Sequence, residues 1–201
     1  MKLAGVPQTL FEMAGVKPEP ARLSDATFII IDAQREYYDC ALPAVGIEAA
    51  IEETAQLLAR ARQSGMPVIH VVHKGKGAMF NPASPGFEIV AQVCPKTGEA
   101  VIEKTLENSF AGSQLEEAIQ RTGRKRLLFA GFMTHNCLST TARAARDLGY
   151  GITIVARATA TRDLPDGKGG VIPAAVVQNV TLAALTDRTA VVVERSIDIR
   201  D

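Results

Sequence analysis

Residues Thr27–Asp32 read TFIIID, a run of large apolar and β-branched side chains that ends at an acid. A strand with one face in water alternates polar and apolar residues. A continuous apolar run is instead typical of a strand buried on both faces of a parallel sheet. Similar runs lie at Pro67–Val72 and Arg126–Gly131. The sequence therefore predicts a fold built around a parallel sheet, with helices covering both faces.

Segments with helical spacing alternate with these runs. Gly65, Gly123 and Gly149 each follow such a segment, and a glycine at this position commonly ends a helix. Ser113 is predicted to cap the second helix, with Glu116 completing a capping box. The expected strands are 27–31, 67–72, 101–102, 126–131, 151–156 and 190–193, and the expected helices are 45–64, 114–122, 138–148 and 173–185. This order predicts an α/β protein with a single-domain, doubly wound, Rossmann-like sheet of about six mostly parallel strands in three layers.

The two ends of the domain are expected to differ. Prolines interrupt residues 1–26, which are predicted to form an N-terminal arm with only a short helical turn around residues 10–14. This arm is expected to pack on the domain or on a neighbouring subunit. Residues 27–201 are predicted to form one domain.

The loop between His73 and Glu99 is long for a compact domain, which indicates a lid or a subunit contact.

Composition narrows the function classes. The 22 basic and 22 acidic residues cancel, and 47% of the residues are hydrophobic, so neither a disordered chain nor a nucleic-acid binder is expected. No apolar run approaches the ~18 residues of a membrane helix, and no signal-like stretch opens the chain. The three cysteines, at positions 40, 94 and 137, are far apart and odd in number. These features predict a cytoplasmic protein without disulfides and without a membrane partner.

Chemically active residues follow several of the predicted strands. Asp32 ends the first strand, His73 the second and Lys104 the third, while Cys137 lies in the loop and helix start after the fourth. Ligands of open parallel sheets bind beyond the carboxyl ends of the strands, so these groups are expected at one edge. A thiol at a helix start is expected to have a lowered pKa, which favours the nucleophilic thiolate. Asp32 would move the proton and Lys104 would hold the thiolate.

Three motifs at these positions resemble a known family. Gly131–Ala142 reads GFMTHNCLSTTA and closely resembles the nucleophile segment of the isochorismatase-like cysteine hydrolases. Ile30–Gln34 resembles the first motif of that superfamily, and Glu103–Lys104 with Ser109–Gly112 resembles its second. The resemblance covers about residues 27–193.

The resemblance implies a doubly wound α/β hydrolase with a catalytic triad of Asp32, Lys104 and Cys137. Members of the superfamily hydrolyse amides, ureido groups or related C–N bonds through a thioester acyl-enzyme. By the same similarity, the peptide bond between Phe132 and Met133 should be cis. The backbone N–H groups of Met133 and Cys137 should then form the oxyanion hole.

Five further residues are expected near the substrate. They follow or flank the family motifs, or stand at a strand end: Gln34, Tyr37, His73, Phe110 and His135. The aromatic residues among them can equally pack the loops. His135 could be taken for the base of a Cys–His pair, but the family pattern favours Asp32 and Lys104. The Thr159–Asp163 segment resembles a family stretch near subunit contacts, and a capped loop that holds the last helix is the alternative reading.

Neither a metal nor an organic cofactor is expected. Nicotinamidases resemble this chain but bind a metal through an Asp-x-His pair and a further histidine, and the matching Tyr37–Leu42 stretch has no histidine. His70 and His73 are three apart, which places them on opposite faces of a strand. The glycine-rich segments 75–77 and 166–170 match no phosphate-binding loop.

Other functions stay open. Isochorismatases proper have another residue at the nucleophile position and cleave a vinyl ether, which Cys137 disfavours. A nicotinamidase-type hydrolase and a catalytically silent interaction protein on the same fold are the remaining alternatives. The expected partners are a small-molecule substrate, uncharged or mildly polar, and further copies of the chain in a homo-oligomer.

Overall fold

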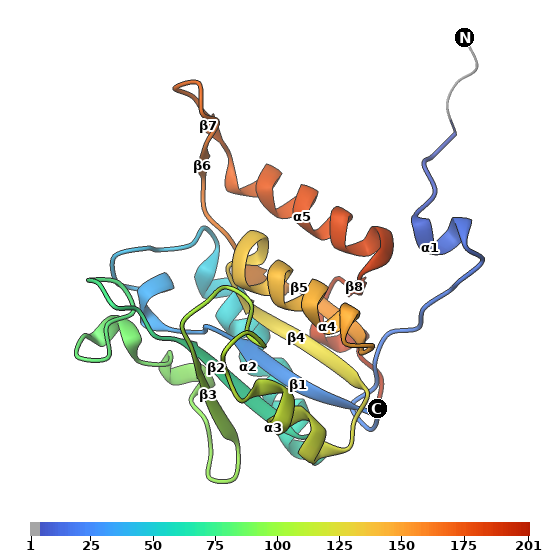
Figure 1. The fold of residues 1–201 in the computed structure, drawn as a ribbon, viewed down its shortest axis with the longest axis horizontal. Helices are drawn as coiled ribbons and strands as arrows, with labels where there is room; N and C mark the ends of the chain where they lie inside the picture. The colour runs from blue at the N-terminus through green and yellow to red at the C-terminus, as the bar shows by residue number, and fades with distance from the viewer. Residues whose placement is uncertain (1–4) are drawn as a thin grey trace.

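Six parallel strands form the central sheet of the computed structural model, which describes residues 5–201 (Figure 1). The strands lie in the order β3-β2-β1-β4-β5-β8, and every neighbouring pair is parallel. Their bounds are β1 Ala26–Ile31, β2 Val68–His73, β3 Ala100–Lys104, β4 Arg126–Phe132, β5 Gly151–Ala160 and β8 Val191–Val193. The predicted parallel α/β sheet is confirmed.

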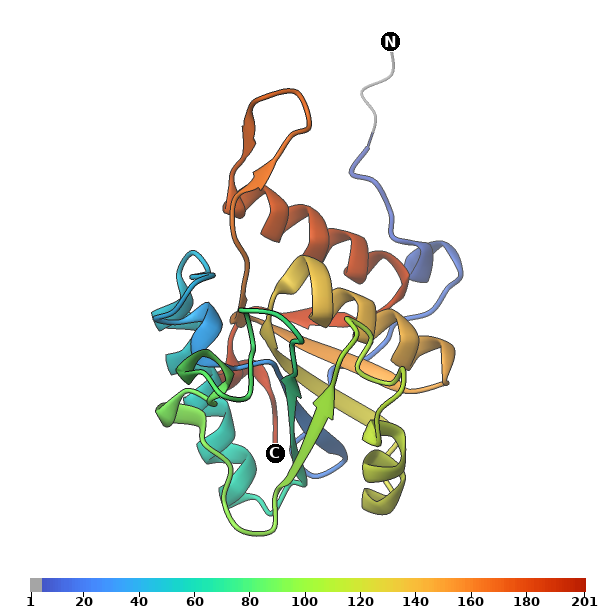
Figure 2. The same ribbon diagram turned by 60° about the vertical axis from the view of Figure 1, so that its left-hand side comes forward.

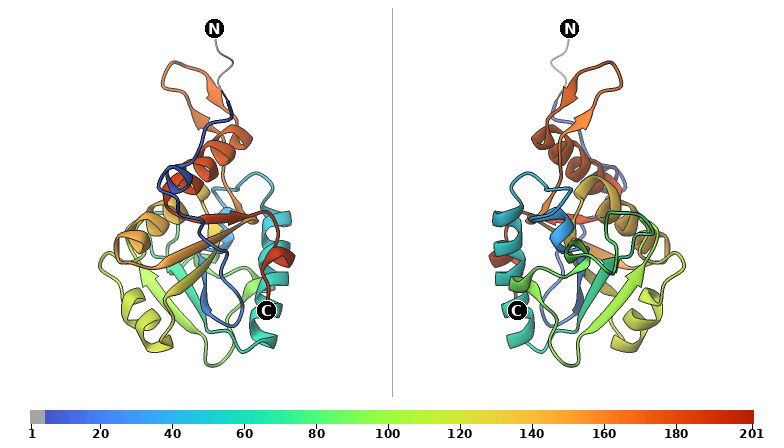
Figure 3. Two further views of the ribbon diagram at one scale, coloured as in Figure 1. Left: turned by 90° about the vertical axis from the view of Figure 1, so that its right-hand side faces the viewer. Right: turned by 90° about the vertical axis from the view of Figure 1, so that its left-hand side faces the viewer.

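The central strand β1 explains why helices cover both faces. All six of its residues are buried. Phe28 and Ile30 pack in the core shared with helix α2, while Ile29 and Ile31 pack in the core shared with α3 and α4. Figure 3 shows α2 on one side of the sheet and α3 and α4 on the other. The helices are α1 Leu10–Met13, α2 Ile47–Gln63, α3 Leu115–Thr122, α4 Ser139–Asp147 and α5 Ala174–Arg188.

Short elements complete the chain. Four 3₁₀ turns span Arg35–Tyr37, Pro85–Phe87, Ala91–Val93 and Ser196–Asp198, and a π-helical turn spans Thr134–Leu138. Strands β6 Leu164–Pro165 and β7 Val171–Ile172 form an antiparallel hairpin that projects from the body of the molecule (Figure 2). Among residues 5–201, no helix has the length and apolar character needed to span a membrane.

Several element boundaries differ from the sequence predictions. β5 extends four residues beyond the expected end, because a register shift between Phe129 and Gly131 lets it continue beside β4 to Ala160. The capping box predicted at Ser113 is wrong. Helix α3 begins one residue later, after Gln114, and the Ser113 hydroxyl donates to the Ser109 carbonyl while accepting from the N–H of Leu115.

The N-terminal arm packs on the domain of its own chain. The predicted helical turn is present as α1, and Thr9 and Glu12 close a capping box around it. The Leu10 N–H donates to Asp187 of α5 over 2.9 Å, and the Arg146 guanidinium of α4 lies 5.5 Å from the centre of the buried Phe11 ring. The arm therefore covers the same side of the sheet as α4 and α5.

Glu99 anchors the end of the long loop that follows β2. Its carboxylate lies 2.7 Å from Arg62 and 3.0 Å from Nε2 of the buried His70, and it accepts the Lys96 N–H over 2.8 Å. Burial alone would raise the pKa of Glu99, but these donors outweigh it and lower the pKa to about 2. The loop is therefore tied to α2 and β2 by a charged group.

We expect Glu99→Gln to lower the melting temperature at pH 7. We also expect the melting temperature of the variant to fall less than that of the wild type as the pH is lowered. The folded protein holds the pKa near 2, below the 4.5 of an unperturbed glutamate. The ion pair therefore stabilises fully above about pH 4.5, and this contribution disappears as the pH falls toward 2. Circular dichroism melts at several pH values measure the difference between variant and wild type. Glu103→Gln, which removes an exposed pair with Lys74, is the control. A Glu99→Gln difference that stays constant down to pH 2 would contradict the assignment.

Candidate active site

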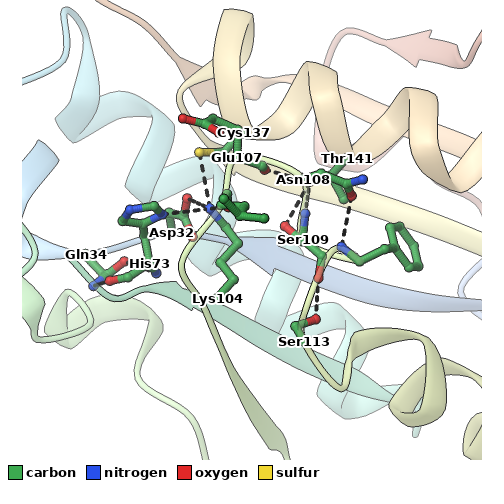
Figure 4. Close-up of polar contacts among 12 residues, drawn as sticks. Asp32, Gln34, His73, Lys104, Glu107, Asn108, Ser109, Ser113, Cys137 and Thr141 are labelled. Atoms are coloured by element: carbon green, nitrogen blue, oxygen red, sulfur yellow. Dashed lines mark hydrogen bonds and ion pairs between the residues drawn. The ribbon is translucent and has the colours of Figure 1, made fainter. Parts of the chain in front are cut away.

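The carboxyl ends of four adjacent strands bring the predicted reactive groups together. Asp32 directly follows β1, while His73 and Lys104 are the last residues of β2 and β3. Cys137 lies in the π-helical turn that follows β4. Because the sheet order is β3-β2-β1-β4, these residues converge on one edge, as Figure 4 shows.

The Lys104 ammonium lies at the centre of the cluster. Its Nζ is 2.8 Å from Asp32 Oδ2, 3.2 Å from Cys137 Sγ and 3.2 Å from His73 Nδ1. A fourth neighbour, the carbonyl of Leu106, lies 3.1 Å away. An ammonium has only three protons to donate, so the four acceptors compete for them. One contact can therefore loosen while the others keep Lys104 in place.

Asp32 is a buried acid with free hydrogen-bonding capacity. The residue is fully buried and has a left-handed φ of 50°. Its Oδ1 has no hydrogen-bond partner among residues 5–201. Burial raises the pKa of Asp32, and the Lys104 charge opposes that rise. Asp32, His73 and Cys137 each offer a polar atom within 4.8 Å of the others, so Asp32 lies close enough to exchange a proton with the thiol after a small movement.

The surroundings of Cys137 favour the neutral thiol over the thiolate. The side chain is only 3% exposed. Burial raises the pKa of Cys137, the Asp32 charge adds to the rise, and Lys104 opposes it. The lowered pKa expected from a helix start is therefore wrong, because desolvation exceeds the effect of the helix end. Rapid alkylation of the free protein at neutral pH is not expected, and the thiol needs a base to become a nucleophile.

The backbone beside Cys137 offers a hydrogen-bond donor. The peptide bond between Phe132 and Met133 is cis. The Met133 carbonyl accepts from the N–H groups of Asn136 and Leu138, which fixes the turn. The Met133 N–H donates to no acceptor among residues 5–201.

Gln34 positions His73. Its side-chain oxygen accepts the His73 N–H over 2.7 Å, and its amide nitrogen donates to the carbonyls of His73 (3.0 Å) and Phe87 (2.9 Å). Gln34 is also fully buried. These contacts occupy its amide, so Gln34 acts through the His73 backbone. Burial lowers the pKa of His73, and Lys104 lowers it further, so the ring is neutral at pH 7 and accepts from the ammonium.

An aromatic group borders the cluster. The Phe80 ring lies 5.0 Å from the Tyr37 ring and 5.1 Å from the His73 ring, measured between centres. Burial raises the pKa of Tyr37, and the charge of Asp32 raises it further. Phe80 was missed from the sequence, because it lies in the long loop and carries no local pattern.

Phe110 and the Ser109–Gly112 motif lie away from the cluster around Lys104. The Phe110 ring stacks on Tyr150, just beyond the end of α4, whereas Cys137 precedes the start of α4. The neighbouring Ser109 is buried and exchanges hydrogen bonds with Thr141 over 3.0 Å and 2.8 Å (Figure 4). The Ser109–Gly112 motif thus anchors the loop after β3 to α4, and the structure does not bring Phe110 to the cluster.

His135, two residues before Cys137, contacts the segment that follows β5. Its Nδ1 is 2.5 Å from the Thr161 hydroxyl, just after β5. Burial lowers the pKa of His135, and the Arg162 charge lowers it further. His135 is therefore uncharged at neutral pH and held by a neighbour other than Cys137.

Three side chains of the cluster carry atoms of the kinds that bind metal ions. Asp32, His73 and Cys137 supply oxygen, nitrogen and sulfur ligand atoms within 4.8 Å of one another. The positively charged Nζ of Lys104 already lies within 3.2 Å of one such atom on each residue. A cation at the centre would be repelled by this ammonium. The residues present therefore do not fit a metal centre.

Comparison with known proteins identifies the family. The isochorismatase domain model matches residues 26–188. The secreted isochorismatase effector Isc1 from Verticillium dahliae is 35% identical over 177 residues, which span 87% of this chain and 90% of the relative. A streptothricin hydrolase from Streptomyces noursei is 30% identical over 167 residues, which span 82% of this chain and 60% of the relative.

A solved structure gives the same assignment. An isochorismatase from Pseudomonas putida KT2440 superposes with a TM-score of 0.92 at 42% identity, and the match covers 96% of this chain and all of the other. The cytoplasmic location stays a prediction, and the Verticillium relative is described as secreted. The match extends over the sheet and over all three motifs, so this chain belongs to the isochorismatase family and is a hydrolase.

Proposed function

We propose that this protein hydrolyses a C–N bond of a small amide or ureido compound through a thioester on Cys137. The observation that carries the proposal is the position of the Lys104 ammonium, 2.8 Å from a buried carboxylate and 3.2 Å from a buried thiol. Relatives named as ureidoacrylate and maleamate amidohydrolases, 25% and 26% identical, support C–N cleavage.

Acylation would begin with proton transfer from the thiol to Asp32. Sγ then bonds to the carbonyl carbon, and the carbonyl electron pair moves onto oxygen. The backbone N–H groups of Met133 and Cys137 would hold this oxyanion. When the intermediate collapses, the C–N bond breaks and the leaving nitrogen takes the proton from Asp32, which leaves an acyl group on sulfur.

Deacylation would reverse these roles. Asp32 removes a proton from water as the water oxygen attacks the thioester carbon. The C–S bond breaks, the acid leaves, and sulfur recovers the proton from Asp32. Lys104 stabilises the negative charge that appears on sulfur in each half of the cycle. No step requires a metal or an organic cofactor.

An ammonia-release screen tests the proposal. The panel contains short-chain amides, carbamoyl compounds and nicotinamide, each with and without exhaustive chelation. We expect ammonia release from at least one amide or ureido compound, unchanged by chelation, and none from Cys137→Ala. Release that chelation abolishes would favour a metal-dependent nicotinamidase. No release from any C–N substrate would favour the catalytically silent protein.

We expect His73→Leu to lower kcat about 10-fold or more on the substrate found by this screen. The variant removes the neutral acceptor at 3.2 Å from the Lys104 ammonium, and hydrogen bonds to charged groups contribute about 1.5–3 kcal/mol. Steady-state kinetics with a melting curve separate this effect from a loss of folding. A folded variant with wild-type kcat would show that His73 does not help to position Lys104.

We also propose that the protein forms a homo-oligomer through α5. Val176 and Val180 on this helix are 48% and 63% exposed, and Val171 on the hairpin is 66% exposed. The helix has no charged residue before Asp187. Such an uncharged, exposed face is typical of an interface. Light scattering should give at least twice the 21.4 kDa chain mass, and Val180→Glu should reduce it. A monomeric mass for the wild type would contradict the proposal.

A further inference from the structure

The reactive cluster is closed to solvent. Asp32 is fully buried, and Lys104 and Cys137 are only 1% and 3% exposed. A substrate carbonyl can therefore reach Cys137 Sγ only after a part of the protein that covers the cluster has moved. Residues 76–84 of the loop after β2 are well placed to do so, because Phe80 is the one buried residue among them and the others are exposed or half-buried.

Phe80 joins this segment to the reactive groups. Its ring centre lies 5.1 Å from that of His73 and 5.0 Å from that of Tyr37. His73 in turn lies 3.2 Å from Lys104 Nζ. The Tyr37 ring centre lies 6.3 Å from that of Phe132, at the end of β4. Phe80 thus contacts the two side chains that border the ammonium and the proposed oxyanion hole.

The backbone of Phe80 needs support from its neighbours. Its φ is 52°, in the left-handed region that favours glycine. Its carbonyl accepts the Gly75 N–H over 2.9 Å, and a Cβ built at Gly75 would lie 2.1 Å from the Met79 carbonyl oxygen. A strained conformation of this kind persists only where the surrounding contacts hold it. Phe80 therefore stays buried only while those contacts last.

The Glu36 carboxylate makes two of the contacts that hold the loop. Glu36 is 3% exposed. Its Oε2 accepts the Phe80 N–H over 3.0 Å, and its Oε1 accepts the Ala41 N–H over 3.2 Å. A Cβ built at Gly86 would lie 2.1 Å from the same Oε2, so the far end of the segment also packs on this carboxylate. Hydrogen bonds to a carboxylate are stronger than those between neutral groups, so this one side chain can hold both ends of the segment.

We propose that Glu36 is a positioning residue, whose carboxylate holds Phe80 against His73 during the reaction and whose release of the Phe80 N–H opens a path to Cys137. In the closed state the His73 ring is fixed beside Lys104, and water is kept from the thiol. In the open state the segment around Phe80 moves aside and the substrate enters. This inference rests on the proposed amide hydrolysis, because it assigns the entry route and the ordering of that same site.

Labelling of Cys137 by iodoacetamide at pH 8 measures the opening without any substrate. Peptide mass mapping follows each thiol, and the exposed Cys94 gives the reference rate in the same sample. We expect Glu36→Met, which removes both acceptors, to label Cys137 about 10-fold or more faster than the wild type. Glu36→Gln keeps one acceptor and should lie between the two. Phe80→Ala removes the covering ring, should label as fast as Glu36→Met, and decides the question if Glu36→Met does not fold.

Two control variants separate opening of the segment from a loss of stability. Glu88→Gln removes an exposed ion pair in the same loop, and Glu99→Gln loosens the far end of that loop. Both should label Cys137 at the wild-type rate. Labelling in Glu99→Gln as fast as in Glu36→Met would assign the effect to lost stability and overturn the inference. Wild-type labelling in a folded Glu36→Met or Phe80→Ala protein would overturn it as well.

Steady-state kinetics keep failure of this inference distinct from failure of the proposed chemistry. On the substrate from the screen, Glu36→Met should lower kcat about 10-fold, because a smaller fraction of the bound enzyme is closed, with little change in KM. Glu36→Gln should recover part of this loss. If no compound is hydrolysed but the labelling rates follow the expected order, the proposed chemistry fails and the role of Glu36 in closing the site stands. Wild-type kcat in a folded Glu36→Met protein would overturn the positioning role.

Discussion

Replacing Cys137 with alanine should lower turnover about 10⁴-fold or more and leave the fold intact. In the proposed cycle no other group can form the covalent intermediate, so the loss should appear in kcat. The sulfur is buried in the core beside α4, and its removal costs little packing because one heavy atom is lost. Kinetics and a melting curve measure the two effects separately.

Cys94→Ala is the matched control for this variant. Cys94 is an exposed free thiol in the long loop, away from the cluster. It should keep wild-type kcat and stability. A Cys137→Ala protein that retained more than a few per cent of the wild-type rate would show that water attacks the substrate directly.

Gly131→Ala should destabilise the protein by about 3 kcal/mol or more, because strain and overpacking add. Gly131 has a φ of 121°, a backbone conformation that residues other than glycine rarely adopt. A Cβ built there would lie 2.0 Å from the Ile31 carbonyl oxygen, in the backbone of the neighbouring central strand. Neither strand can move without shifting Asp32 or Met133, which follow them.

Gly123→Ala separates strain from steric clash. Gly123 also has a positive φ, 70°, but a Cβ there meets nothing within 4 Å. Its replacement should cost only about 1 kcal/mol. Urea unfolding of the two variants measures the difference. Equal losses would show that close approach of β4 to β1 is not what requires glycine at position 131.

The parts of the fold that sequence predicts well are the ones set by burial. The TFIIID run, for example, specifies a strand covered on both faces, and β1 is that strand. The end of β5 escaped prediction because it depends on a register shift against β4, and the β6–β7 hairpin because strands of two residues carry no periodic signal. Boundaries that depend on a neighbouring strand are not encoded locally.

The site likewise contains residues that the sequence places correctly and contacts that it does not reveal. Asp32, Lys104 and Cys137 follow strand ends, so topology alone brings them together. The role of Gln34 was missed because its partners, His73 and Phe87, are 39 and 53 residues away. The pKa of Cys137 was predicted in the wrong direction because a helix end is visible in sequence whereas full desolvation is not.

Acid quenching within the first turnover, followed by peptide mass mapping, tests the central claim most directly. With the amide or ureido substrate from the screen, the account predicts a mass increase equal to the acyl group on the peptide that contains Cys137. The increase should be reversed by hydroxylamine and absent from Cys137→Ala. Turnover without any adduct, or with the adduct on Cys40 or Cys94, would contradict a thioester on Cys137.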